Sequence, residues 1–251
     1  MNKIYKEFYK NKVFSIGEAN KIIKDYDTCK NTISRLISSK QIKRIKSGLY
    51  YIVPIDNPQF EPESIHIASK LKDNIIISHN TALTTFKLLQ KEKTIFASYN
   101  RHSKLRVRKD NIKIFRNKHQ FGIIETEYNT GYSTISVKTT DIERTILDCV
   151  WNKTIKISEL INILKQAKTQ NILINITKII QYLEKYHKPV LYHKVGYILD
   201  SIREYYNFQE TDLELIRKKL SKKNFYIKEK GLMILRPKYF YNNKWKLMIP
   251  K

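Results

Sequence analysis

Apolar positions recur at helical spacing in three short stretches near the start of the chain. They occupy residues 3–10, 15–23 and 28–40. The second stretch opens with the Ser-x-x-Glu spacing of a capping box, in which a serine hydroxyl and a glutamate satisfy backbone amides reciprocally. Asp27 or Thr28 is placed to cap the third. We therefore predict three consecutive helices.

A β-rich segment follows these helices. Residues 42–45 and 49–53 combine β-branched and aromatic residues, and Lys46-Ser47-Gly48 between them supplies a turn. Three helices followed by such a hairpin are typical of a winged helix-turn-helix. We predict that this domain spans residues 1–55.

The third predicted helix has two unlike faces when its residues are placed about 100° apart. One face is apolar and should pack on the other two helices; it carries Cys29, Ile33, Leu36 and Ile37. The opposite face offers polar groups and one cation but no carboxylate; it carries Asn31, Ser34, Arg35 and Ser38. Arginine reads guanine and asparagine reads adenine through paired hydrogen bonds, so this face is a candidate for reading bases in the major groove.

Further cations flank this helix. Lys30, Lys43, Arg44 and Lys46 are predicted on the helix, on the hairpin or near its turn. There they could contact phosphates or the minor groove. The alternative interpretation is a small helical domain with a solvated basic face.

The rest of the chain predicts a larger domain over residues 56–251. Three prolines between residues 54 and 62 mark the linker. We expect a mainly antiparallel sheet from strands at 94–98, 111–116, 122–127 and 132–138. We expect helices at 63–71, 81–89, 141–151, 158–168, 175–186 and 189–206. The fold class is therefore α+β, and Gly196 within the last helix indicates close backbone packing.

Charge narrows the class of partner. The chain of 251 residues has 48 Lys and Arg against 23 Asp and Glu, a net charge of +25. Such an excess favours a polyanionic partner, above all nucleic acid, although the abundance of Ile, Lys and Asn also fits an AT-rich genome. No apolar run reaches membrane-spanning length, and the first residues lack a signal-peptide pattern. With two unpaired cysteines, we expect a cytoplasmic protein that does not bind membranes.

A second basic stretch lies at residues 101–118, with eight basic residues and one acidic residue. Such a stretch could bind phosphates without reading sequence, or could be a solvated loop. Its candidate phosphate contacts crowd a predicted loop and strand start: Arg101, Lys104, Arg106, Arg108 and Lys109.

Motifs for catalysis or metal binding were not found in the sequence. No Asp or Glu is followed two places later by Lys, and the one Asp-x-Asp, residues 25–27, reads as a turn. We interpret His79 as structural, and Glu143 with Arg144 as an internal ion pair. We therefore assign no catalytic residue, no metal site and no cofactor.

Five segments, taken in order, resemble the AbiEi family of antitoxins and transcriptional regulators from abortive-infection, type IV toxin–antitoxin systems. They are ISRLISSKQIKRIKSGLYYIVP, IISHNTALTTFKLL, TTDIERTILDCV, HKVGYILDSI and MILRPKYFYNNKWKLMIP. The resemblance implies a repressor that binds inverted repeats in its own operator. It also implies an antitoxin to a co-encoded nucleotidyltransferase toxin, without tight toxin binding. We expect a monomer or weak dimer in solution, with or without cooperativity on double-stranded DNA.

Two other classes stay open at this point. One is a metal-dependent nuclease, or another nucleic-acid-processing enzyme, that carries a winged-helix DNA-binding domain. The other is a structural interaction module whose charge reflects genome composition. Metal-dependent cleavage of DNA would identify the first class. Failure of the protein to bind its own upstream DNA selectively would favour the second class.

Overall fold

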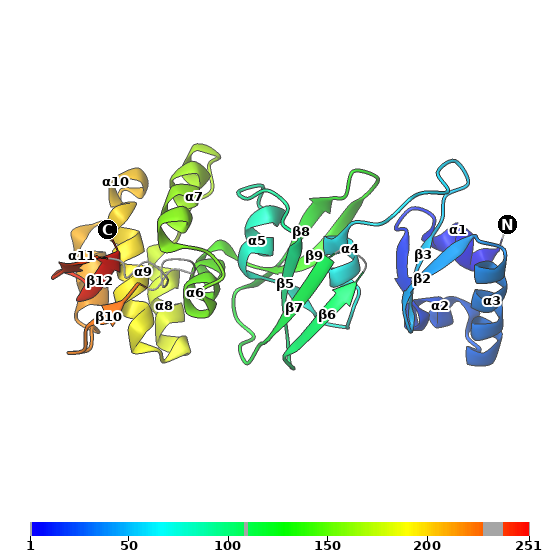
Figure 1. Cartoon of the computed structure of the whole chain (residues 1–251), viewed down its shortest axis with the longest axis horizontal. Coiled ribbons are helices and arrows are strands. Elements are labelled where there is room, and N and C mark those ends of the chain that lie inside the picture. Colours follow the sequence, from blue (N-terminus) through cyan, green and yellow to red (C-terminus); the bar gives the residue numbers. More distant parts are fainter. Residues whose placement is uncertain (1, 108–109, 228–237, 251) are drawn as a thin grey trace. The chain divides into compact units, whose positions relative to one another are not determined.

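The computed structural model describes residues 2–107, 110–227 and 238–250 (Figure 1). The chain forms two compact units. Unit 1 comprises Met1–Ile77 and Glu92–Thr139, and unit 2 comprises Ser78–Lys91 and Thr140–Lys251. Within the described residues, every helix is too short or too polar to cross a lipid bilayer.

Three helices and a three-stranded antiparallel sheet open unit 1. The elements are α1 (Lys3–Phe8), β1 (Val13–Ser15), α2 (Ile16–Ile23), α3 (Tyr26–Ser38), β2 (Ile42–Lys46) and β3 (Leu49–Ile52). The strand order is β1-β3-β2, so β2 is an edge strand. The capping box at the start of α2 is confirmed: Ser15 Oγ accepts from Glu18 N, and Glu18 accepts from Ser15 N. The short strand β1 was not expected from the sequence.

Helix α3 begins two residues earlier than the sequence suggested. Its N-cap is Asp25, whose carboxylate accepts a 2.7 Å hydrogen bond from Thr28 N, so the caps expected at Asp27 or Thr28 are wrong. The hydrogen bonds from Thr28 also hold the pKa of the Asp25 carboxyl below its usual range. Asp27 consequently lies in the first turn of the helix, where a carboxylate interacts favourably with the helix dipole.

Strand β3 is buried on both faces because it lies between two cores. Successive strand side chains point to opposite faces. Tyr50 and Ile52 join the helices in one apolar cluster, with Ile33 and Leu36 of α3. Tyr51 joins a second cluster that extends into the following part of unit 1. The alternation explains why all four residues of β3 are apolar and none is exposed.

A six-stranded sheet forms the rest of unit 1, with order β6-β7-β5-β4-β9-β8. It is preceded by α4 (Ser64–Ser69). Its strands are β4 (Ile76–Ile77), β5 (Thr94–Tyr99), β6 (Ser103–Val107), β7 (Asp110–Arg116), β8 (Ile123–Asn129) and β9 (Thr134–Thr140). The pairs β5–β7 and β4–β9 are parallel, whereas β4–β5 and β6–β7 are antiparallel. The sheet therefore mixes parallel and antiparallel pairs, whereas the sequence predicted a mainly antiparallel sheet.

Helices dominate unit 2. They are α5 (His79–Thr85), α6 (Ile142–Asn152), α7 (Ile157–Thr169), α8 (Ile176–Tyr186), α9 (Pro189–Ser201), α10 (Arg203–Tyr206) and α11 (Glu210–Arg217). The single helix expected over residues 189–206 breaks at Ile202, where the backbone leaves the α conformation. Helix α11 was not expected.

A small three-stranded sheet packs in the same unit: β10 (Phe225–Tyr226), β11 (Tyr239–Asn242) and β12 (Leu247–Pro250), in the order β10-β12-β11. Its packing explains Gly196. A Cβ atom at Gly196 would lie 2.0 Å from the ring of Trp245, which is fully buried and donates its indole N–H to Asp200. The close approach predicted for Gly196 is confirmed.

Buried charges join α6 to α8. Arg144 pairs with Asp148 one turn later on α6, at 3.4 Å. Lys178 of α8 reaches Asp141 at 2.8 Å and Glu143 at 3.4 Å. Glu143 and Arg144 point to different partners because adjacent helical positions lie about 100° apart. The sequence predicted an internal ion pair between Glu143 and Arg144, and the structure shows a wider network of charges instead.

Candidate nucleic-acid interface

The polar face of α3 is exposed along its length. Asn31, Ser34, Arg35 and Ser38 are all exposed, whereas Cys29, Ile33 and Leu36 are buried. Ser38 donates to the backbone oxygen of Ser34 at 3.1 Å, which directs its hydroxyl back onto the helix. Asn31 and Arg35 therefore carry the long polar groups of this face, one turn apart.

One carboxylate joins this face. Because α3 begins at Tyr26, Asp27 lies one turn before Asn31 and on the same side. Its side chain is 88% exposed, and Lys30 approaches it at 3.9 Å. Lys30 also lies over the ring of Tyr26, 4.3 Å from its centroid. The face without acidic groups expected from the sequence thus begins only at Asn31, and Lys30 has local partners.

Register places two cations of the hairpin on opposite faces of the sheet. Arg44 lies opposite Tyr50, on the sheet face that packs against the helices, and its guanidinium is 5.8 Å from the Tyr50 ring centroid. Lys43 lies opposite Tyr51 and so points to the other face. Both are exposed because β2 is an edge strand. Of the two, Arg44 shares the side of the sheet occupied by α3.

Lys46 lies in a hollow of about 330 Å³ at the hairpin turn. Burial and nearby Lys72 lower the pKa of Lys46. In the same hollow, Lys70 donates a 2.6 Å hydrogen bond to Glu18. Burial raises the pKa of Glu18, but the hydrogen bonds from Lys70 and Ser15 outweigh it and hold that pKa below its usual range. The hollow gathers lysines from separate segments, which the sequence did not indicate.

The second basic stretch forms an edge hairpin rather than a loop. Lys104 of β6 lies directly opposite Lys113 of β7, and Arg101, just before β6, is exposed. Like charges in direct cross-strand register destabilise a sheet, although Lys113 gains a contact with the Phe115 ring at 4.7 Å. Arg106 belongs to β6, while Arg108 and Lys109 lie outside the described residues. Lysines on an edge strand also prevent pairing with other sheets.

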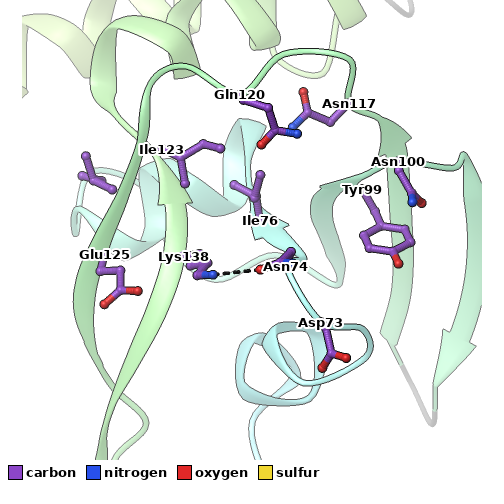
Figure 2. Close-up of a pocket in the computed structure, with 11 residues that line it drawn as sticks. Asp73, Asn74, Ile76, Tyr99, Asn100, Asn117, Gln120, Ile123, Glu125 and Lys138 are labelled. Atoms are coloured by element: carbon purple, nitrogen blue, oxygen red, sulfur yellow. Dashed lines mark hydrogen bonds between the residues drawn. The ribbon is translucent and has the colours of Figure 1, made fainter.

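A different concavity, of about 450 Å³, lies where the parallel strands β5 and β7 end (Figure 2). Four carboxamides line it: Asn74, Asn100, Asn117 and Gln120. Its charged groups are Asp73, Glu125 and Lys138, and Lys138 donates to Asn74 at 3.0 Å. With two carboxylates and one ammonium group, this concavity is less suited to phosphate than α3 and β2. Sequence reasoning missed it because its lining comes from five separate segments.

His79 is held by its neighbours. It is 1% exposed with a φ of 57°; Nδ1 is 2.8 Å from Ser78 Oγ, and Nε2 is 2.9 Å from Asn152 Nδ2. Both ring nitrogens are thus engaged within the fold, as the structural interpretation expects. Among the described residues, histidines, cysteines and carboxylates nowhere gather in a group of three or more that could hold a metal ion.

Comparison with known proteins adds no assignment: the chain matches no protein-family model and no curated protein. The arrangement of α3, β2 and the edge hairpin is therefore interpreted from its own chemistry.

Proposed function

We propose that the chain is a sequence-specific, double-stranded DNA-binding repressor whose residues 1–55 form a winged helix-turn-helix. The observation that carries this proposal is the exposed face of α3, on which Asn31 and Arg35 stand one turn apart above a buried apolar face. An α-helix fits the major groove, where these two side-chain types make paired hydrogen bonds with adenine and guanine. Helix α3 is then the recognition helix.

The hairpin β2–β3 serves as the wing in this proposal. Arg44 lies on the sheet face shared with the helices and is the wing's best-placed phosphate contact. Lys43, on the opposite face, would meet a flanking phosphate only if the backbone of the DNA passes around the edge strand. Lys46 and Lys30 lie closer to the surface of the domain and add positive electrostatic potential there. These contacts position the helix and carry no sequence information.

The edge hairpin β6–β7 supplies a second phosphate surface in the proposal. Lys104 and Arg101 are exposed there. In the sequence, Arg106, Arg108 and Lys109 belong to the same basic run. Such a surface raises affinity for any DNA and increases its dependence on salt.

The regulatory role follows the AbiEi resemblance. We propose that the repressor binds inverted repeats in its own operator and acts, through the part of the chain after residue 55, as antitoxin to a co-encoded nucleotidyltransferase. What supports this is that four of the five resembling segments contribute elements that pack together in unit 2: α6 packs on both α5 and α9, and Gly196 of α9 packs on Trp245.

The direct test is titration of the full chain against the duplex that precedes its own coding sequence. The proposal expects a complex that survives an excess of random duplex, weakens as salt rises, and protects repeated half-sites from nuclease. Equal affinity for the upstream and random duplexes would contradict sequence-specific repression. Cleavage of the duplex in the presence of Mg²⁺ or Mn²⁺ would instead support the nuclease interpretation.

Antitoxicity needs a separate test. The neighbouring nucleotidyltransferase gene, expressed alone and together with this chain, should arrest growth only when expressed alone. Continued arrest in the presence of the full chain would contradict the antitoxin part of the proposal. The DNA-binding part would then be decided by the titration alone.

A further inference from the structure

A hollow of about 440 Å³ in unit 2 lies between the end of α6, the start of α9 and strand β10. Its walls are apolar and aromatic, with Trp151 and Tyr226 among them. The charged groups that line it are Lys153 and Lys194, and no carboxylate is found among its described lining residues. The site therefore suits a flat ring that is attached to a negatively charged group.

The aromatic rings of the hollow are open to solvent. Trp151 is 40% exposed and Tyr226 is 48% exposed. Lys188 lies 5.1 Å from the centre of the Trp151 ring, so a cation already covers part of it. The other tryptophan, Trp245, is fully buried. Trp151 thus presents part of its ring to solvent.

Tyr226 also belongs to an aromatic face of the small sheet. The register aligns Tyr226 of β10, Met248 of β12 and Tyr241 of β11 in one row across the three strands. Tyr239 contacts Tyr226 edge to face, with ring centroids 5.3 Å apart. The opposite face holds the buried side chain of Leu247. One side of this sheet therefore closes the core, and the other presents tyrosines.

The segments that form the small sheet and lead into it are rich in lysine. Residues 221–227 and 238–250 carry five lysines and no aspartate or glutamate. Lys244 pairs with Asp200 at 2.8 Å, but Lys222, Lys223 and Lys238 are exposed. Exposed aromatic rings in segments that also carry exposed lysines meet the two requirements for single-stranded nucleic acid, which are stacking surfaces and phosphate neutralisation.

We propose that unit 2 binds single-stranded nucleic acid, with one base beside Trp151 and Tyr226 in the hollow and the neighbouring base on the tyrosine face. Double-stranded DNA does not fit this site, because its bases are stacked on one another and cannot stack on tyrosine. An acidic protein partner would use the lysines but would not require aromatic faces. The activity is separate from the duplex binding proposed for α3.

The test is fluorescence anisotropy of the full chain with a labelled oligothymidylate of about ten nucleotides. Tyr226→Ala and Trp151→Ala should each weaken binding about 5- to 100-fold, and Tyr226→Phe should bind like the wild type because it keeps the ring. Tyr205→Ala is the matched control, since Tyr205 is 47% exposed and has Lys165 over its ring at 4.9 Å. That control should change nothing.

Intrinsic fluorescence gives a second measurement. Oligothymidylate should quench tryptophan emission, and the quenching should vanish in Trp151→Phe because Trp245 is buried. Wild-type affinity in both alanine variants, with unchanged melting, would overturn the proposal. So would equal competition by a duplex of the same length, or no binding of oligothymidylate at low salt. Arg35→Ala should keep full affinity for the single strand, which separates this site from the repressor function.

Discussion

Positive charge is used in opposite ways by α3 with β2 in unit 1 and by α6 with α8 in unit 2. Arg144 is 2% exposed and paired with Asp148, and Lys178 meets two carboxylates. Tyr182 donates to Asp141, and Tyr186 donates to Asp148. Arg35 and Lys43, by contrast, stand in solvent.

The pairing of charges in unit 2 also shifts the pKa values of the groups that take part in it. Burial, together with the hydrogen bond to Asp141, raises the pKa of Tyr182 to about 12. Burial lowers the pKa of Lys178, but the bonds with Asp141 and Glu143 outweigh it and raise that pKa. Groups so strongly coupled stabilise the fold only while all of them are present. Exposed cations lower the stability of the fold little and remain able to bind a polyanion. The net charge of the chain is therefore a poor guide to function unless the cations that pair with carboxylates are left out of the count.

The largest expected effect separates the two regions by stability. Arg144→Ala leaves Asp148 buried without its cation and should lower the free energy of unfolding by about 3–5 kcal/mol. Arg35→Ala should change it by less than about 0.5 kcal/mol, because the side chain is exposed. Urea denaturation of both variants measures this. Comparable losses would show that Arg35 also has a structural role.

A pH experiment sharpens the contrast between buried and exposed charge. Burial, helped by Lys70, lowers the pKa of His66 to about 4, while Glu18 opposes this shift; Nδ1 of His66 lies 2.9 Å from Tyr132 Oη. The unfolded chain therefore binds the proton more readily, and stability contributed by neutral His66 is present above about pH 6.5 and lost as pH falls toward 4. We expect a loss of about 3 kcal/mol relative to His66→Gln over this window. Parallel pH curves for the two proteins would contradict the assignment.

Salt dependence tests the exposed cations of the edge hairpin. Replacing Arg101 and Lys104 together by Gln should weaken binding to operator and random duplexes alike. The slope of log K against log salt should flatten by up to about 1.8, or about 0.9 for each lost phosphate contact. An unchanged slope would mean that these residues do not contact phosphates and only prevent the edge strand from pairing with other sheets.

Asp27 gives the smallest effect and the opposite sign. Its carboxylate lies beside Asn31 on the face proposed to enter the groove, so Asp27→Asn should tighten DNA binding about two- to fivefold by removing repulsion from phosphates. Helix stability should fall by no more than about 1 kcal/mol, since Asp25 remains the cap. Weaker binding in this variant would mean that the carboxylate accepts a hydrogen bond from a base.

Local patterns predicted much of the fold. The capping box of α2, the apolar stripe of α3 and the close packing at Gly196 all depend on residues near in sequence or on one helix. The mixed sheet was missed because β4 has only two residues and its strand pairing joins Ile77 to Thr139, far apart in the chain. The break at Ile202 was missed because apolar spacing continues through it.

The candidate site was likewise predicted only where it depends on local patterns. Exposure of Asn31 and Arg35 follows from helical phase, and the sequence predicted it. The position of Asp27 depended on which aspartate caps the helix, a choice between Asp25 and Asp27 that composition does not make. The opposite directions of Lys43 and Arg44 follow from strand alternation, but which of the two shares the face of the helices depended on the register of β2 with β3. The Trp151 hollow joins α6, α9 and β10, and no local pattern indicates it.

The most direct test of α3 as a reading helix is the affinity of Arg35→Ala for operator and random duplexes in one titration. The variant should lose about 1–3 kcal/mol on the operator, relax discrimination at one base position, and bind random duplex almost as the wild type does. Its salt slope should change little, unlike that of the edge-hairpin variant. Unchanged affinity for both duplexes would contradict the assignment of this face to base recognition.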